Sequence, residues 1–327
     1  MAPVLLNFLY SQLFVGLPKP TGTLTGKTAL VTGSNIGLGK EAARHFVSLG
    51  ASTVILAVRS ASKGAAAKED ILKTTKATAD VVQVWELDMS SYDSVLAFAA
   101  RCDKELERVD VAVLNAGVAK GKFEMAEKDE STITINVVST FLLALALLPK
   151  MKATAQTFDT RPNLEIVSSE VHMFTAFKER SAPQGGLFDL LGQDTGKVDM
   201  ADRYQISKLL EVLFVRAMVQ RRSSLQIPVT INYVNPGLCH SALSRDASFV
   251  LEIGKFLLAR STEVGSRTLV HAAMQGGVAH GEYMSDCKIT QPSKFVLSEE
   301  GYVWQERVWD ELTKKLEAIK PGVTSNL

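Results

Sequence analysis

Apolar runs and helical patterns alternate along most of the chain. Short apolar runs that end in glycine or polar residues predict buried strands over residues 27–32, 51–58, 81–87, 109–114, 164–168 and 229–234. Patterns of helical period predict helices over residues 40–47, 62–76, 92–106, 128–151, 201–222, 262–275 and 303–319. This alternation is typical of an α/β fold built on a doubly wound parallel sheet.

Residues 170–202 interrupt the alternation with aromatic side chains, the pair Gly185-Gly186 and several charges. A loop of that length inside a compact domain is unusual and often functional. We therefore expect a single domain over residues 26–327, in which residues 170–202 and 240–260 form a substrate pocket. Residues 1–25 are expected to be an extension that packs on this domain.

The first predicted strand ends in a turn that contains Gly33, Gly37 and Gly39. Gly33 permits a sharp turn, Gly37 lets the backbone approach a pyrophosphate, and Gly39 lets the following helix pack closely on the strand. The N-terminus of that helix offers free N–H groups and a positive dipole end to phosphates. The turn thus predicts a dinucleotide site, although its spacing, G-x-x-x-G-x-G, differs from the common G-x-G-x-x-G.

Composition and charge exclude several classes of function. Apolar residues make up 46% of the chain and charged residues 22%, as in ordinary globular proteins. The net charge of +1 gives no reason to expect a nucleic acid as partner. Widely spaced Cys102, Cys239 and Cys287 indicate reduced thiols in a cytoplasmic protein, and the five histidines lack the spacing of a metal site.

An apolar stretch, Val4–Leu17, stands near the start of the chain. At about 14 residues it is too short to cross a bilayer, and Asn7, Ser11 and Gln12 interrupt it. It also lacks the basic region and cleavage site of a signal peptide. It can pack on the domain or over the mouth of a site, or touch a membrane surface peripherally. Because its polar face is not basic, we favour packing.

Tyr204 and Lys208 are four residues apart in a predicted helix, so they share a face. A free phenol has a pKa of about 10 and is a poor acid–base catalyst at neutral pH. A nearby ammonium stabilises the phenolate and lowers that pKa. The spacing also occurs by chance on amphipathic helices, so the pair alone does not separate a catalytic from a structural role.

At this point the chain resembles the short-chain dehydrogenase/reductase family, from about Gly26 to at least Ser241. The resemblance rests on ordered motifs: Thr32-Gly33-Ser34-Asn35-Ile36-Gly37-Leu38-Gly39, Asp88, Asn115-Ala116-Gly117, Asn136, Ser168-Ser169, Tyr204 with Lys208, and Asn235-Pro236-Gly237. The long gap before Tyr204 is similar to the retinol-dehydrogenase-like branch. It is also similar to fungal reductases, many of which modify secondary metabolites.

The resemblance implies a Rossmann fold and a set of catalytic roles. Tyr204 would donate the proton to a carbonyl oxygen, and Lys208 would lower the pKa of Tyr204 and hold the nicotinamide ribose. Ser169 would bind the substrate oxygen, and Asn136 would hold a water in the proton relay. Without the other motifs, the preferred interpretation of Asn136 is a buried, hydrogen-bonded helix residue.

The resemblance also implies the contacts of a nicotinamide cofactor. Asp88 would accept a hydrogen bond from adenine, Asn115 would brace the central strands, and the backbone of Leu238 would bind the carboxamide. Ser241 replaces the usual threonine and keeps its hydroxyl. The full expected set is Gly33, Ser34, Asn35, Ile36, Gly37, Leu38, Gly39, Arg59, Ser60, Lys63, Asp88, Met89, Asn115, Ala116, Gly117, Tyr204, Lys208, Pro236, Gly237, Leu238 and Ser241.

Arg59 favours NADP(H) over NAD(H). Sites that prefer NAD carry an acid near the end of the second strand, which binds the ribose 2′-hydroxyl. Here the strand ends in Ala57-Val58-Arg59-Ser60, and an arginine can bind a 2′-phosphate in two places at once. Ser60, Lys63 and Asn35 can assist. The alternative is that Arg59 is a solvated residue at a strand end.

These residues favour an NADPH-dependent reductase of a ketone or aldehyde, which reversibly oxidises the alcohol. Ser169, Met173, Phe174 and His240 are the expected substrate contacts, while His172 is expected to be structural. Apolar residues Phe177, Leu187 and Phe188, and the stretch 244–258 with Phe249, Val250, Leu251 and Phe256, suggest a pocket for a sizeable apolar molecule.

Two other classes of function stay open. One is a non-redox enzyme of this fold, for cyclisation or isomerisation, and the other is a protein that senses NADP(H). The intact Ser169, Tyr204 and Lys208 favour an oxidoreductase over both. The substrate, its stereochemistry and the oligomeric state do not follow from the sequence.

Overall fold

The structure, a computed structural model, describes residues 2–240 and 258–327. Its centre is an eight-stranded sheet in the order β10-β9-β8-β7-β4-β1-β2-β3. All neighbouring strands are parallel except the pair β9 and β10. The strands are β1 (Thr28–Thr32), β2 (Thr53–Val58), β3 (Val82–Glu86), β4 (Val111–Leu114), β7 (Asn163–Val167), β8 (Thr230–Asn235), β9 (Tyr283–Ser285) and β10 (Lys288–Thr290). The expected doubly wound sheet is confirmed.

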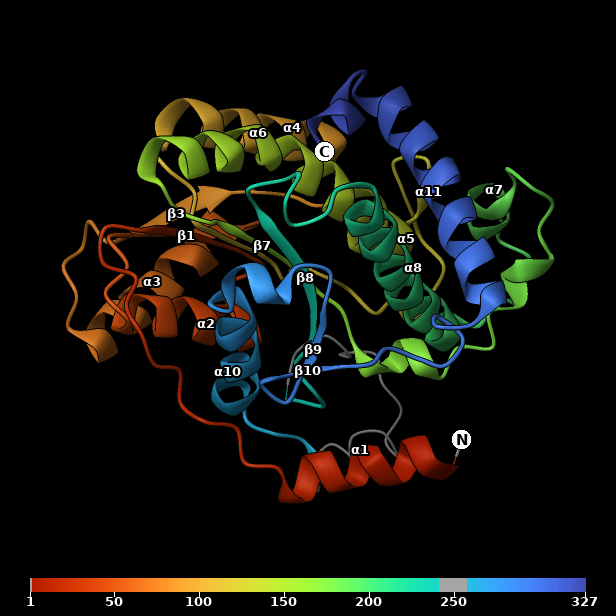
Figure 1. Ribbon diagram of the computed structural model, residues 1–327, viewed down its shortest axis with the longest axis horizontal. Coiled ribbons are helices and arrows are strands. Elements are labelled where there is room, and N and C mark those ends of the chain that lie inside the picture. Colours follow the sequence, from red (N-terminus) through yellow and green to blue (C-terminus); the bar gives the residue numbers. More distant parts are fainter. Residues whose placement is uncertain (1, 241–257) are drawn as a thin grey trace.

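Helices cover both faces of the sheet (Figure 1). One core lies under α2 (Gly37–Ser48), α3 (Ala61–Thr75) and α10 (Thr262–Ala273). The other lies under α4 (Tyr92–Glu105), α6 (Thr140–Phe158) and α8 (Met200–Arg221), with α11 (Glu299–Ile319) packed on α8. A short helix, η5 (Gly276–Ala279), follows α10, and η6 (Val323–Asn326) follows α11.

The strands are apolar on both sides because both faces of the sheet are covered. In β1, Leu30 belongs to one core while Ala29 and Val31 belong to the other. In β2, Ile55 belongs to the core under α4, α6 and α8, and Leu56 belongs to the core under α2, α3 and α10. Such strands appear in the sequence as continuous apolar runs, which is why most of them could be predicted.

The helix expected over residues 128–151 differs from the prediction. A two-stranded hairpin of β5 (Met125–Ala126) and β6 (Asp129–Glu130) precedes it. The helix begins as α5 (Ser131–Ile133), widens into a π-helical turn, η1 (Thr134–Ser139), and continues as α6. By length and composition this is the one helix among the described residues that could cross a membrane, but 89% of its most apolar window is buried inside the protein.

Residues 170–202 contain more regular structure than expected. They form η2 (Glu170–Met173), η3 (Lys178–Ser181) and α7 (Leu187–Leu191) before α8 begins. Strands β9 and β10 were also not predicted, because each has only three residues. Runs this short carry too little periodicity to be recognised in a sequence.

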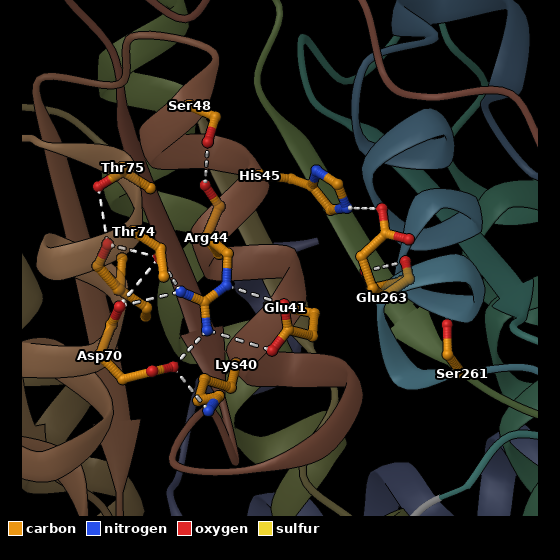
Figure 2. Close-up of polar contacts among 12 residues, drawn as sticks. Lys40, Glu41, Arg44, His45, Ser48, Asp70, Thr74, Thr75, Ser261 and Glu263 are labelled. Atoms are coloured by element: carbon orange, nitrogen blue, oxygen red, sulfur yellow. Dashed lines mark hydrogen bonds and ion pairs between the residues drawn. The ribbon is translucent and has the colours of Figure 1, made fainter.

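Ion pairs join the helices on the α2 face (Figure 2). Arg44 on α2 binds Glu41, Asp70 and Thr74, and Lys40 donates to Asp70 at 2.9 Å. Arg44 and then Lys40 lower the pKa of Asp70 to about 2. These contacts fix α3 against α2, the helix that follows the glycine turn.

The N-terminal helix α1 (Ala2–Phe14) lies apart from the other helices, along one end of the molecule (Figure 1). Arg260 holds it by donating to Ser11 O at 2.6 Å and to Asp286 at 2.7 Å, and Ser11 Oγ donates to Asp286 at 2.6 Å. Its outer side chains remain 53–73% exposed at Leu6, Tyr10, Leu13 and Phe14. Thus α1 docks through polar contacts and adds little to the core.

Deleting residues 2–15 should leave the fold intact, because α1 is held mainly by hydrogen bonds to Arg260, which keeps its partner Asp286. Hydrogen bonds to a charged group contribute about 1.5–3 kcal/mol, so we expect the melting temperature to fall by only a few degrees. Thermal unfolding followed by circular dichroism measures this. An insoluble product, or one without a cooperative transition, would contradict the prediction.

Candidate functional site

The turn between β1 and α2 contains three glycines in two different environments. Gly33 and Gly37 have φ of +66°, a conformation that L side chains rarely adopt. A Cβ at Gly39 would lie 2.5 Å from Asn115 Nδ2 and 2.8 Å from Gly33 O. A Cβ at Gly37 would meet nothing within 4 Å. Gly33 and Gly39 are therefore packed against protein, while Gly37 faces open space.

The same turn approaches the end of β4. A Cβ at Gly33 would lie 3.0 Å from Ala116 Cα. Asn115 Nδ2 donates to Thr32 O at 2.9 Å, and Thr32 Oγ1 accepts from Ala116 N at 2.9 Å. These bonds join β1 to β4 where the order of the strands reverses, which is where open α/β sheets bind ligands.

The start of α2 has no side-chain cap. Ile36 stands at the N-cap with its side chain 48% exposed, and no side chain there accepts from the first N–H groups. Uncapped N–H groups beside an open glycine form a site that suits phosphate oxygens. Ser34 does not add its hydroxyl, as it is buried and donates to Val31 O at 2.8 Å. Asn35 is half-buried at the turn.

The end of β2 presents basic side chains to solvent. Arg59 and Lys63 are exposed, and in residues 2–240 and 258–327 no hydrogen bond or ion pair engages the Arg59 side chain. The hydroxyl of Ser60 caps α3 by accepting from Lys63 N at 3.4 Å. The guanidinium and the ammonium are thus available to an anion, and Ser60 shapes the turn that carries them.

The two residues after Leu87, which follows β3, differ in their surroundings. Asp88 Oδ1 accepts from Ser90 N at 2.9 Å and from Ser90 Oγ at 2.7 Å, and Asp88 N donates to Ser94 Oγ at 2.9 Å. Asp88 is half-buried. The side chain of Met89 lies in the core, so only its backbone can reach a ligand.

Asn136 lies in the π-helical turn η1, a feature often found at functional sites. Its amide donates to Val118 O and to Ser207 Oγ and accepts from Val118 N, each at 2.9 Å. Both N–H bonds are therefore used, and the residue braces the segment after Gly117 against α8. A water can bind the Asn136 side chain only by donating to its oxygen.

The two serines after β7 point to different partners. Ser168 is buried and donates to Lys208 O at 3.2 Å. Ser169 Oγ accepts from Val171 N at 3.3 Å and lies near the Tyr204 hydroxyl. The second serine of the pair is thus the one beside the tyrosine.

Tyr204 and Lys208 lie on the same face of α8, with Lys208 Nζ 5.8 Å from the centre of the Tyr204 ring. The ammonium donates to Val167 O at 2.9 Å and to Glu211 Oε1 at 2.8 Å. Burial raises the pKa of Tyr204, and Lys208 only partly offsets this. Lys208 thus lowers the pKa of Tyr204 as expected, but burial outweighs this effect and the net shift is upward.

The loop after β8 lies under α1. Gly237 has φ of +77°, and a Cβ there would be 2.7 Å from Gln12 Nε2. With its terminal amide oriented so that both atoms find partners, Gln12 donates to Leu238 O at 3.1 Å and accepts from Leu238 N at 3.2 Å. Pro236 is buried and His240 is exposed. Ser241 and most of the stretch 244–258 lie outside the described residues.

A cavity of about 280 Å³ opens next to η2, with Met173, Phe177, Arg180 and Leu209 in its lining. Phe174 is 37% exposed. Leu187 and Phe188, expected beside Ser169, instead pack into the core, because they belong to helix α7 and not to a loop. Of the large apolar residues expected in the substrate pocket, Met173 and Phe177 line this cavity.

His172 joins η2 to the segment before α11. Its Nε2 accepts from Ser293 N at 3.1 Å, so its Nδ1 carries the proton and donates to Ser169 O at 2.7 Å. Burial lowers the pKa of His172 to about 4. The ring is neutral and holds the turn that carries Ser169.

Two acids near these residues were not recognised in the sequence. Glu211 contacts Lys208, and Glu170 directly follows Ser169 and donates its backbone N–H to Asn235 Oδ1 at 3.1 Å. Burial and then Asp286 raise the pKa of Glu170 to about 7, against the attraction of Arg260. Spacing from Tyr204 could have pointed to Glu211, which is on the same helix, but nothing in the sequence indicates Glu170.

Comparisons with known proteins identify the family of this chain. The family model described as short chain dehydrogenase matches residues 27–157. The short chain dehydrogenase/reductase dmxR8 of Cryptosporiopsis sp. is 58% identical, over 98% of this chain and 100% of its own. The short-chain dehydrogenase anuD of Penicillium roqueforti is 42% identical, over 97% of this chain and 84% of its own.

Solved structures share the fold. A protein of Mycobacterium paratuberculosis superposes with a TM-score of 0.69 at 23% identity, covering 92% of this chain and 98% of its own. A short chain dehydrogenase of Shigella flexneri, complexed with NADP, superposes with a TM-score of 0.60 at 22% identity, covering 82% of this chain and 100% of its own.

The chain belongs to the short-chain dehydrogenase/reductase family. Members of this family are oxidoreductases that act on small molecules with a nicotinamide cofactor. The expected family and fold are thus confirmed.

Glu170 should make stability depend on pH. Because the pKa of Glu170 is raised to about 7 in the folded protein, the folded state binds more protons than the unfolded state between pH 4.5 and 7. The free energy of unfolding therefore falls as pH rises through this range. Glu170→Gln should stabilise the protein at pH of about 8 by about 1–2 kcal/mol, after allowance for partial exposure, and should do little near pH 5.

Denaturant titrations at both pH values measure this difference. Glu69→Gln, a change at an exposed acid on α3, serves as the control and should alter neither value. Equal stability of Glu170→Gln and wild type at both pH values would show that the surroundings of Glu170 do not raise its pKa.

Proposed function

We propose that the protein is an NADP(H)-dependent reductase of a ketone or aldehyde, in which Tyr204 donates the proton. The observation that carries this proposal is the convergence of Ser169, Tyr204 and Lys208 near the carboxyl ends of the central strands, beside the glycine turn. The reaction is reversible, so the same residues oxidise the corresponding alcohol.

The residues at the β1–α2 turn fit a dinucleotide. The open side of Gly37 and the uncapped start of α2 suit its phosphates, and Arg59 with Lys63 suits a ribose 2′-phosphate. Asp88 retains Oδ2 for a donor such as the adenine amino group. When bound, NADPH supplies the hydride. The NADP in the Shigella flexneri relative is consistent with this assignment.

The surroundings of Tyr204 keep its phenol protonated. Since burial raises the pKa of Tyr204, the phenol carries at neutral pH the proton that it would donate. Ser169 stands beside it and can hold the same carbonyl oxygen. Val167 and Glu211 accept from two of the three N–H groups of Lys208. The third N–H can donate to a ribose hydroxyl or to a water.

The proposal includes a substrate class and a location. Met173, Phe177 and Leu209 suit an apolar body, and the fungal relatives support a role in modifying secondary metabolites. The buried free thiols of Cys102, Cys239 and Cys287 support a cytoplasmic location. A panel of carbonyl compounds, followed by NADPH absorbance, separates a reductase from a non-redox enzyme and from a cofactor-sensing protein.

Tyr204→Phe removes the proposed proton donor and changes packing little. General acid catalysis typically contributes ~10²–10⁴-fold, so kcat for carbonyl reduction should fall by at least this range while the affinity for NADPH changes little. Tyr302→Phe, at an exposed tyrosine on α11 that bonds to Gln220, is the matched control and should keep full activity. Near-normal turnover of Tyr204→Phe would remove the tyrosine from the mechanism.

Arg59→Asp replaces the proposed 2′-phosphate ligand by an acid. A hydrogen bond to a charged group contributes about 1.5–3 kcal/mol. The affinity of wild type should therefore be roughly 10- to 100-fold higher for NADPH than for NADH. The variant should lose that preference and gain some affinity for NADH. Quenching of tryptophan fluorescence gives both dissociation constants.

Lys73→Asp makes the same change of charge at an exposed position near the other end of α3, and it should leave the preference in place. If wild type binds both cofactors equally, or Arg59→Asp does not change their ratio, Arg59 is only a solvated residue at a strand end.

A further inference from the structure

The ammonium of Lys208 has a buried counter-charge that the proposed reaction does not use. Glu211 lies one turn further along α8, with Oε1 2.8 Å from Lys208 Nζ. The side chains of Lys208 and Glu211 are only 6% and 2% exposed. A buried pair of this kind is weak evidence for stability, because the loss of hydration offsets much of the attraction. Its placement next to Tyr204 calls for another explanation.

We propose that Glu211 is a positioning residue: its carboxylate holds the Lys208 ammonium at the end of β7 and offsets its charge, so that Tyr204 keeps its proton and acts as the donor in carbonyl reduction. This inference rests on the proposed function of Tyr204. It concerns a residue two turns away from the tyrosine, which touches neither the substrate nor the tyrosine's hydroxyl.

The geometry fixes the ammonium in one place. Glu211 Oε1 and Val167 O, one from α8 and one from β7, take two of the three N–H bonds of Lys208. The ammonium also lies near Gly117, where a Cβ would be 3.8 Å from Nζ. Without Glu211 a single carbonyl would hold the ammonium, and the flexible lysine side chain would have more freedom to move.

The charges act in opposite directions on the phenol. Lys208 lowers the pKa of Tyr204 and Glu211 raises it, and among the described residues these are the two charges that act on it. The ionised Lys208 and Glu211 together carry a net charge close to zero. Burial therefore determines that the pKa of Tyr204 is raised. Burial also raises the pKa of Glu211 to about 7, so the carboxylate is ionised throughout the alkaline range in which a tyrosine titrates.

Other elements bring few charges to this place. Glu211 lies near the Ser168 hydroxyl, which donates to Lys208 O, and its other oxygen, Oε2, is buried without a partner among the described residues. Lys208 is the charge that acts on Glu211 there. The remaining ionisable groups on the elements packed against α8 are Glu170 and His172 of η2, Tyr233 of β8, and, on α11, Glu299, Glu300, Tyr302, Glu306, Arg307, Asp310, Glu311, Lys314, Lys315 and Glu317.

Glu211→Gln tests the proposal because it keeps the shape and removes the charge. Glu211 raises the pKa of Tyr204 and loses its charge in this variant, so the pKa of Tyr204 should fall by up to about one unit. The pH profile of kcat for alcohol oxidation, and the alkaline limb for carbonyl reduction, should both move to lower pH. The KM for substrate should change less than about threefold, since Glu211 touches no substrate.

A second readout does not depend on turnover. The phenolate absorbance of the cofactor-free protein, taken as the difference between wild type and Tyr204→Phe, titrates Tyr204 directly. The same difference in the Glu211→Gln background should show the shift. The control is Glu306→Gln. It breaks the partly exposed ion pair between Glu306 of α11 and Arg221 of α8, and it should move neither profile.

Glu211→Asp gives a graded form of the test and serves if Glu211→Gln does not fold. Its carboxylate ends one methylene short of Lys208, so both profiles should move in the same direction by a smaller amount. Loss of stability or of kcat with both pH profiles unmoved would overturn the proposal and leave Glu211 a structural partner. Full activity of Tyr204→Phe would instead overturn the proposed function, while the absorbance titration would still decide the role of Glu211.

Discussion

The backbone of the β1–α2 turn lies so close to the end of β4 that no side chain fits between them. Gly33 meets Ala116, and Gly39 meets Asn115, at distances that a Cβ would make impossible without a shift. This approach sets α2 tightly on the sheet and leaves Gly37 as the one glycine of the turn with open space beside it. The uncapped start of α2 and Arg59, which directly follows β2, lie at the same carboxyl edge of the sheet as this opening.

A second constraint acts at the end of β7, where the protein buries an ammonium. Lys208 is held by a main-chain carbonyl and a buried acid, and α8 is fixed at the same point by Ser168 and, through Ser207, by Asn136. These bonds place Tyr204 relative to Ser169 more firmly than the packing of two aliphatic surfaces would. They also explain why Asn136 lies in a π-helical turn, since the wider turn is compatible with an amide that reaches both Val118 and α8.

The sequence was sufficient for the sheet and for most of the residues around the crevice, because apolar runs and glycine turns are local signals. It was not sufficient for β9 and β10, which are too short to show a period, or for α7, whose Leu187 and Phe188 are equally typical of a pocket. The net direction of the Tyr204 pKa shift could not be predicted for a different reason. A motif gives the lysine one turn away, but the sum of burial and the opposing charge of Glu211 requires three-dimensional placement.

The N-terminal helix and the cofactor compete for one backbone group if the family's use of Leu238 holds here. A backbone N–H makes one strong hydrogen bond, and Leu238 N is already bonded to the amide of Gln12. A nicotinamide carboxamide carries the same oxygen and NH₂ group as a glutamine side chain, so the two can satisfy Leu238 in the same way. Binding the carboxamide at Leu238 would then require Gln12 to leave, and the affinity for the cofactor would include the cost of moving it. Arg260, which ties Ser11 to Asp286, would influence that affinity from outside the proposed cofactor site.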